Sequence, residues 1–397
     1  MKNLDGFLKK VDLEEALIQN IGDNKTSVFE EDKNFIVKLI EKNRYYKIEA
    51  DGKISEFIFY EDKTPGDIGK DKDGNTLDGV EKPYEIWSIE DLVVFSNLTN
   101  GSGYKLENGE PVKISASDNF SGKKVILKQE LNFKSDLSYI NSKRTDLFDN
   151  NTEEAKDLKT LMTSGNGFIP IKNYRGSFDG ENNEIKNIFI ENNGSAALFV
   201  GGSISEIKNL GISGSVTGSG LAVAGIFADG SVSIIDNCYN KAEIIGNGTN
   251  TNWAAGIAVR TISKITNCYN TGNVTNKVYV SGQAGGINSQ LGGNTIENCY
   301  NTGNISGKTY VGGIAGGHGN GRTNIKNSYN TGNISGSRCG GILGTNGNII
   351  ENCFNKGKIS SSQYAGGIVG TNVSEIYNCF NTGEIKGVQC GRSMSNN

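Results

Sequence analysis

Short runs that alternate apolar and polar residues, separated by glycine and asparagine, fill the second half of the chain. In one unit, residues 311–316 are followed by the runs 324–329 and 330–334. Such runs, rich in β-branched and aromatic residues, are typical of strands. Glycine at this density would cost a helix about 1 kcal/mol per residue. The pattern therefore predicts about three short strands per unit and excludes a helical repeat.

A four-residue phrase, Asn-Cys-Tyr-Asn or a close variant, recurs through this region. It begins at Asn237, Asn267, Asn298, Asn327, Asn352 and Asn378, so successive copies are 30, 31, 29, 25 and 26 residues apart. A period in this range marks a solenoid, whose units bury their apolar faces only against neighbouring units. We therefore expect an all-β fold, a right-handed parallel β-helix (solenoid) over residues 84–397, with a small N-terminal α+β module and a capping helix.

Aligned coils place residues of one kind in columns. The first Asn of each phrase is expected to bond to its neighbour about 4.8 Å away and to adopt the left-handed conformation of a bend, which is a structural role. A column of branched side chains and a column of small ones should point inward. They are Ile226, Ile257, Ile287, Ile314, Ile342 and Ile368, and Ala224, Ala255, Ala284, Val311, Cys339, Ala365 and Cys390.

The cysteines follow the same columns. Cys339 and Cys390 are two coils apart, about 9.6 Å, which is too far for a disulfide. A stack of thiols along one axis does not form the tetrahedron that zinc prefers. We therefore expect free, buried thiols and no metal at the two cysteines above and at Cys238, Cys268, Cys299, Cys353 and Cys379.

The chain before the repeats divides into two parts. Residues 1–62 predict a helix over 4–21 and three strands over 35–40, 44–49 and 54–60, with Asp51-Gly52 as a hairpin turn. Residues 63–83 form a polar linker. Its loop from Asp71 to Asp78 has acids at alternate positions, as calcium loops do, but Lys82 stands where the last carboxylate belongs. A calcium site and a solvated turn both remain open.

A capping helix is predicted within residues 84–100. Ser88 and Asp91 form an S-x-x-D helix start, and Leu92, Val93, Phe95 and Leu98 form the apolar side. A helix here would cover the open end of the solenoid, whose strand edges are otherwise unpaired. We expect the first coil strand at residues 124–132, a surface excursion at 134–165, and further coils from residue 168 onward.

Composition narrows the function only slightly. The formal net charge is −4, which is neither a nucleic-acid nor a membrane-surface signature. No run of 18 apolar residues is present, so no membrane span is expected, and no signal peptide is visible at the start. These observations predict a soluble chain that is either cytoplasmic or lacks its export segment.

The residues 311–316 and 325–332 resemble the GLUG repeat of bacterial surface proteins, and the resemblance extends over about residues 198–397. Residues 84–92 and 178–180 are similar to the segment that often precedes such solenoids. The resemblance implies a secreted or surface-anchored bacterial protein used for adhesion or as a stalk, with a pilin-like first module. Some GLUG proteins are metallopeptidases with an H-E-x-x-H helix, which this chain lacks, because His318 is its only histidine.

An enzyme remains the alternative, because many parallel β-helices cleave acidic glycans as lyases or glycosidases. The best candidate column runs Asp236, Thr266, Glu297, Lys326, Glu351, Tyr377. Glu297 and Glu351 would lie about 9.6 Å apart, near the upper limit for an inverting pair. Lys326 falls between them, however, and favours an outward ladder of ion pairs.

The aromatic column of the phrase is expected to point outward, because it follows the inward cysteines. It comprises Tyr239, Tyr269, Tyr300, Tyr329, Phe354 and Phe380. Such a column either holds sugars or a partner surface, or covers strand edges. At residues 387–391 another coil begins, whose edge either pairs with a second chain or frays.

The sequence thus favours a non-enzymatic, extracellular or cell-surface repeat protein, an adhesin or stalk, with no catalytic, cofactor-binding or metal-binding residues. The expected partner is a glycan or a host or bacterial surface protein, and not a nucleic acid.

Overall fold

The computed structural model describes the residues 26–28, 35–41, 45–50, 53–58, 66–71, 73–107, 110–133, 167–248, 253–277, 282–290, 292–317, 323–345, 349–371 and 375–391. The predicted helix at 4–21, the excursion at 134–165 and His318 lie outside these residues.

An antiparallel meander forms the first described part. It consists of β1 (Thr26–Val28), β2 (Phe35–Glu41), β3 (Tyr45–Ala50) and β4 (Lys53–Ile58), in that order. Ala50 pairs with Lys53, which is the register of a two-residue hairpin. The three predicted strands are confirmed, and β1 is an additional strand.

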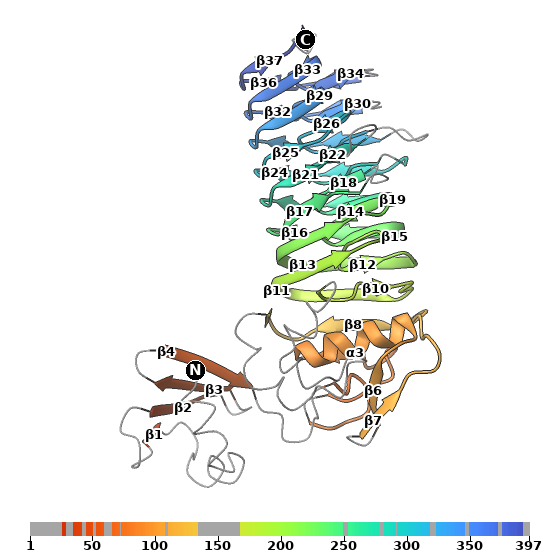
Figure 1. Cartoon of the computed structure of the whole chain (residues 1–397), viewed down its shortest axis with the longest axis vertical. Coiled ribbons are helices and arrows are strands. Elements are labelled where there is room, and N and C mark those ends of the chain that lie inside the picture. Colours follow the sequence, from red (N-terminus) through yellow and green to blue (C-terminus); the bar gives the residue numbers. More distant parts are fainter. Residues whose placement is uncertain are drawn as a thin grey trace.

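The second part is a tall stack of parallel strands, in which each strand pairs with its counterpart one coil later (Figure 1). The parallel β-solenoid is thereby confirmed. Its strands are β5 (Tyr84–Ile86), β8 (Lys124–Leu127), β9 (Leu131–Asn132), β10 (Ile171–Lys172), β11 (Ser177–Asn192), β12 (Phe199–Val200), β13 (Ser203–Gly218), β14 (Ala222–Ala224), β15 (Phe227–Asp236), β16 (Tyr239–Asn240), β17 (Glu243–Gly246), β18 (Trp253–Ala255), β19 (Ala258–Thr266), β20 (Tyr269–Asn270), β21 (Val274–Asn276), β22 (Gln283–Gly285), β23 (Thr295–Glu297), β24 (Tyr300–Asn301), β25 (Ile305–Ser306), β26 (Tyr310–Gly312), β27 (Asn324–Lys326), β28 (Tyr329–Asn330), β29 (Ile334–Gly340), β30 (Leu343–Thr345), β31 (Ile349–Glu351), β32 (Phe354–Asn355), β33 (Ile359–Gly366), β34 (Val369–Thr371), β35 (Glu375–Tyr377), β36 (Phe380–Asn381), β37 (Ile385–Lys386) and β38 (Gln389–Gly391).

A helix closes the lower end of this stack. Helix α3 (Ile89–Asn100) begins with a capping box between Ser88 and Asp91, as predicted. It lies across the first coils (Figure 1), where the Ser96 hydroxyl donates to the Ile169 carbonyl and the Asn100 amide donates to the Pro170 carbonyl. The first residues of the segment 84–100 form β5, which pairs with β8, and the helix fills the remainder from the predicted start at Ser88. A hairpin of β6 (Tyr104–Glu107) and β7 (Glu110–Lys113) follows the helix.

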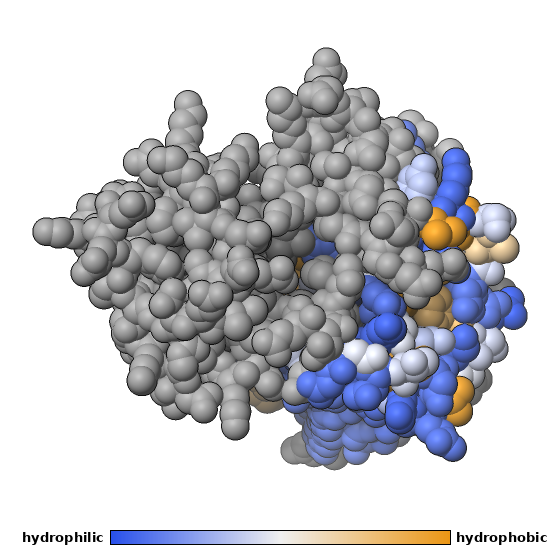
Figure 2. Space-filling view, turned by 90° about the horizontal axis from the view of Figure 1, so that it is seen from below, coloured by the Kyte–Doolittle hydropathy of each residue, from blue (hydrophilic) through white to orange (hydrophobic). Residues whose placement is uncertain are grey.

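Large aromatic side chains fill the first coils. The Phe95 ring meets Phe120 and Tyr174 edge-on, at centroid distances of 5.1 Å each. Phe178 lies between Phe95 and Phe199. All of these side chains are almost fully buried, so the capping helix shares one apolar core with the first coils. From below, the described surface is mostly hydrophilic, with separate hydrophobic residues (Figure 2).

Isoleucines line the core of the later coils, and every predicted member of that column is fully buried. The predicted small column was misaligned in its first two members, because Ala255 pairs with Gly285 and it is Ala254 that pairs with Ala284. Ala and Gly are both small, so the sequence pattern did not distinguish the two registers. The structure gives the column Val223, Ala254, Ala284, Val311, Cys339, Ala365 and Cys390.

The last Asn of each phrase forms a buried ladder, which the sequence analysis missed. Each amide nitrogen donates to the oxygen of the next amide at 2.6–2.7 Å and to a carbonyl two residues ahead. A glycine column makes room for it: a Cβ on Gly286 would lie 2.2 Å from the Gly313 carbonyl and 2.6 Å from Asn301. The ladder comprises Asn240, Asn270, Asn301, Asn330, Asn355 and Asn381.

Candidate functional site

The aromatic column points outward, as predicted. Each ring begins a strand of two residues, preceded by a buried Cys or Ser and followed by an inward Asn. The rings are half-buried, except for Phe380, which is 52% exposed. We call the six rings the aromatic stripe: Tyr239, Tyr269, Tyr300, Tyr329, Phe354 and Phe380.

The rings of the stripe stack on one another. Their centroids are 4.8–5.3 Å apart and their planes differ by 1–9°. Each inner ring face is therefore covered by the next ring, and only ring edges and hydroxyl groups remain for a ligand. A sugar that packs on a ring face would find such a face at Phe380 but not along the middle of the stripe.

A carboxylate holds the first ring of the stripe. The Tyr239 hydroxyl donates to Glu184 at 2.9 Å, and the Lys241 ammonium reaches the same carboxylate at 2.7 Å while lying over the ring. Burial raises the pKa of Glu184, but hydrogen bonds from Lys241, Ser213 and Tyr239 outweigh it and hold that pKa below its ordinary value. Burial and the Glu184 bond both raise the pKa of Tyr239. This hydroxyl is therefore an occupied donor.

The first Asn of each phrase, from Asn237 to Asn378, forms an exposed column beside the stripe. Its members have φ between 48° and 54°, which confirms the predicted left-handed bends. Three steps of the column carry an amide bond, at 3.3 Å from Asn298 to Asn267, 3.1 Å from Asn352 to Asn327 and 3.2 Å from Asn378 to Asn352. Asn267 donates to the Asp236 carboxylate instead. The predicted structural role of this column is thereby confirmed.

The column proposed for acid–base chemistry alternates Glu297, Lys326 and Glu351 and contains an ion pair. Glu297 pairs in register with Lys326, and Lys326 with Glu351. The Lys326 ammonium lies 3.0 Å from the Glu351 carboxylate. A lysine therefore separates the two glutamates, as the ladder interpretation predicted.

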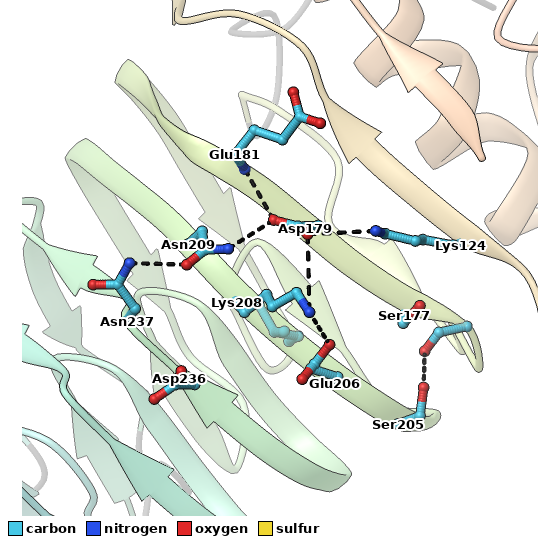
Figure 3. A network of polar contacts seen from close by, with 12 residues as sticks. Lys124, Ser177, Asp179, Glu181, Ser205, Glu206, Lys208, Asn209, Asp236 and Asn237 are labelled. Carbon is cyan, nitrogen blue, oxygen red and sulfur yellow. Dashed lines mark hydrogen bonds and ion pairs between the residues drawn. The ribbon is translucent and has the colours of Figure 1, made fainter. Parts of the chain in front are cut away.

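The same column begins, in earlier coils, at Asp179, which pairs in register with Lys208 and through it with Asp236. A denser polar network surrounds Asp179 (Figure 3). One carboxylate oxygen accepts from the Glu181 backbone at 3.1 Å and from the Asn209 amide at 2.9 Å, and the other faces Lys124 and Lys208 at 3.5 and 3.9 Å. Burial raises the pKa of Asp179, but these partners outweigh it and lower that pKa. Since both oxygens are occupied, this network fastens neighbouring coils together.

The linker loop that resembles a calcium site is a hydrogen-bonded turn. The Asp71 carboxylate accepts from the Asp73 backbone and from both the backbone and the side chain of Asn75, at 2.8–2.9 Å. Asp78 accepts from the backbones of Val80 and Lys82. Within the described part of the chain, no group of three or more His, Cys, Asp or Glu residues is arranged to hold a metal ion.

The cysteines are free, as predicted, and six of them are buried. Burial raises the pKa of Cys339 to about 12 and that of Cys268 and Cys299 well above the ordinary value. Cys390 is the exception: it is exposed, because no described coil stacks on β38. Buried thiols of this kind act as small core side chains.

Trp253 and Arg260 form a further contact that no sequence motif marks. The Arg260 guanidinium lies 5.6 Å from the centre of the Trp253 ring and pairs with Asp229. The available signal was composition, because the chain has two tryptophans and one lies among the repeats.

These observations define a parallel β-solenoid repeat protein with long, regular side faces. The model of the GLUG motif matches residues 307–335 and 361–386, so the chain carries GLUG motifs in its C-terminal coils. No curated protein and no solved structure matches the chain. No helix in the described ranges is long and apolar enough to cross a membrane.

Proposed function

We propose that this chain is a non-enzymatic, extracellular or cell-surface repeat protein of a bacterium, an adhesin or stalk that presents an elongated face. The observation that carries the proposal is the aromatic stripe, which runs unbroken through six coils. A solenoid offers such faces because each coil repeats the surface of its neighbour. The antiparallel sheet β1–β4 is compatible with a pilin-like first module.

The regularity of the stripe favours an extended partner. Ring edges recur at about 4.8 Å along the axis, beside the exposed Asn column, and the four tyrosines add hydroxyl groups. A partner that runs along the axis, such as a glycan chain or a strand of another surface protein, would meet a ring edge and an amide in each coil. A compact ligand would meet only one or two of them.

The alternative is a lyase or glycosidase that acts on acidic glycans, with Glu297 and Glu351 as acid and base. The ion pair from Lys326 to Glu351 counts against it, since the lysine lies in register between the two glutamates, where the glycosidic bond would have to lie.

A glycan-array screen, with and without calcium and followed by mass analysis of any bound glycan, separates these readings. Intact bound glycan supports the adhesin. Shortened glycan overturns it in favour of the enzyme, and Glu297→Gln should then abolish cleavage. If no glycan binds, the stalk stands and the glycan-binding adhesin does not.

A further inference from the structure

One corner of the solenoid departs from the repeat pattern. Small side chains meet there in a cluster apart from the main core, made of Ala197, Ala222, Ala224, Ala228, Ala255 and Val259. The half-buried Trp253 packs against this cluster. The corner therefore has a tryptophan at its edge, where neighbouring coils have other residues.

The Arg260 side chain covers that tryptophan in a strained backbone conformation. Its φ is 83°, which is an outlier for a bulky residue. Asp229 also has a positive φ, of 62°. Its carboxylate forms an ion pair with Arg260 and accepts a hydrogen bond from the Ser195 hydroxyl. Strain of this kind persists only where the surroundings enforce it, and it gathers at binding and catalytic sites.

The next coil places unpartnered polar groups beside this pair. Gln283 pairs in register with Trp253. Asn288 pairs in parallel with Ala258. The residues that follow, Ser289 and Gln290, therefore lie next to Val259 and Arg260 of the preceding coil. Among the residues that the structure describes, both amide atoms of Asn288 and four further buried atoms here have no hydrogen-bond partner: Trp253 Nε1, Gln283 Oε1, Ser289 Oγ and Gln290 Oε1.

These polar groups belong to this coil and not to the repeat. Gln283 is 7% exposed and Ser289 is fully buried. Asn288 pairs with Ala258 of the preceding coil and Ala315 of the following one. The position equivalent to Ser289 is therefore occupied by Val259 in the preceding coil and by Gly316 in the following one. Buried polar atoms without partners destabilise a fold, and stacking of coils does not require them here. A role in binding explains why they are present.

We propose that this corner binds a neutral, hydroxyl-rich sugar of a glycan, an inference that rests on the proposed adhesin function. The orphaned atoms include an obligate donor, two acceptors and a hydroxyl that serves as either. Sugar hydroxyls both donate and accept, so they satisfy such a mixture, while the tryptophan supplies the apolar surface that ligand sites combine with a few polar groups. Arg260 is already neutralised by Asp229, which favours an uncharged sugar.

Arg260→Gly is the decisive variant. Glycine adopts a positive φ without strain, so this variant should keep the backbone bend while losing the Asp229 ion pair and the side chain that holds the Trp253 ring in place from one face. Gln290→Ala is the second variant, since it removes one orphaned acceptor. Arg338→Ala is the matched control, because Arg338 also lies over an aromatic ring, that of Tyr310. In the strand column of Gln283, Tyr310 lies one coil further on and Arg338 two.

The experiment is titration with neutral and acidic oligosaccharides, followed by tryptophan fluorescence in a Trp87→Phe background so that Trp253 is the reporter. We expect a fluorescence change with a neutral oligosaccharide, at least a tenfold weaker affinity in Arg260→Gly and Gln290→Ala, and no change in Arg338→Ala.

Neutral-glycan binding that survives Arg260→Gly and Gln290→Ala overturns the corner site and leaves the proposed adhesin intact. Binding only to acidic glycans or to peptides also overturns this inference. A wild-type chain that binds no glycan, with ordered water bridging the four orphaned atoms in a crystal structure, overturns both the site and the glycan-binding adhesin.

Discussion

The coils before residue 237 and those after it are held to their neighbours by different side-chain contacts. In the first coils, rings of different residues interlock inside the core, with interplanar angles of 88° and 89° around Phe95. In the later coils the rings lie outside and stack in parallel, and identical amides bond in the interior. Interlocking shapes fit in one arrangement, whereas a ladder fits equally well when shifted by one coil. The first coils therefore set the register, and the repeats propagate it.

Phe178→Ala should break the first region most severely. The side chain is almost fully buried between Phe95 and Phe199, so its loss should reduce the free energy of unfolding by about 3–5 kcal/mol. Urea unfolding followed by circular dichroism measures the loss. Tyr300→Ala, in the aromatic stripe, should cost only about 1–2 kcal/mol, since it removes two stacking contacts. Equal losses would contradict the distinction between the two regions.

Asn301→Ala tests the interior ladder of the second region. It leaves the Asn270 amide nitrogen and the Asn330 amide oxygen without their partner, and each unsatisfied buried group costs about 1–3 kcal/mol. We expect about 3 kcal/mol less stability in the same urea assay. The control is Asn298→Gly, which removes an exposed amide but keeps the left-handed bend and should change stability by less than about 0.5 kcal/mol. A neutral Asn301→Ala would show that the ladder is dispensable.

Ser88→Ala probes how far the cap governs the first coils. The Ser88 hydroxyl accepts from the Asp91 backbone at 3.1 Å, and loss of such a cap costs about 1 kcal/mol. Hydrogen exchange should quicken in α3 and β10 and remain unchanged beyond residue 237. The exposed Ser121→Ala should leave both regions unchanged. Faster exchange throughout the later coils would mean that the two regions unfold as one unit.

Acidification tests the junction of the two regions, where Glu184 of β11 holds Tyr239 and Lys241 of the first repeat. The pKa of Glu184 is lower in the folded chain than its ordinary value of 4.5, so its contribution is complete above about 4.5 and is lost as the pH falls through the lower folded value. Thermal melting between pH 7 and 3 should show a smaller loss of stability in Glu184→Gln than in the parent. Identical profiles would contradict this assignment.

Much of this fold was readable from the repeats because periodicity reports which residues are equivalent. The isoleucine column, the left-handed Asn and the outward rings all follow from alternation and spacing. The register of Ala255 did not, since Ala and Gly give the same signal. The buried Asn ladder was also missed: the first and last Asn of each phrase look alike in sequence, and only the strand geometry turns one outward and the other inward.

The candidate binding corner was less predictable, for a physical reason. Trp253 and Gln283 are 30 positions apart and become neighbours only through strand pairing. Ser289 and Gln290 carry no motif, and what marks them is the lack of a hydrogen-bond partner, which requires coordinates. Sites of this kind arise where one coil departs from the consensus.

The interior ladder also has a direction. From Asn240 to Asn355, every amide donates to the amide of the next coil toward the C-terminus, and at the other end the Asn240 oxygen already accepts from the Ala242 backbone. Aligned amide dipoles add, as they do in a helix, so the stack carries partial positive charge at its C-terminal side. The two ends of the solenoid are therefore electrically unlike, and an added coil that offers an amide oxygen fits the C-terminal end alone.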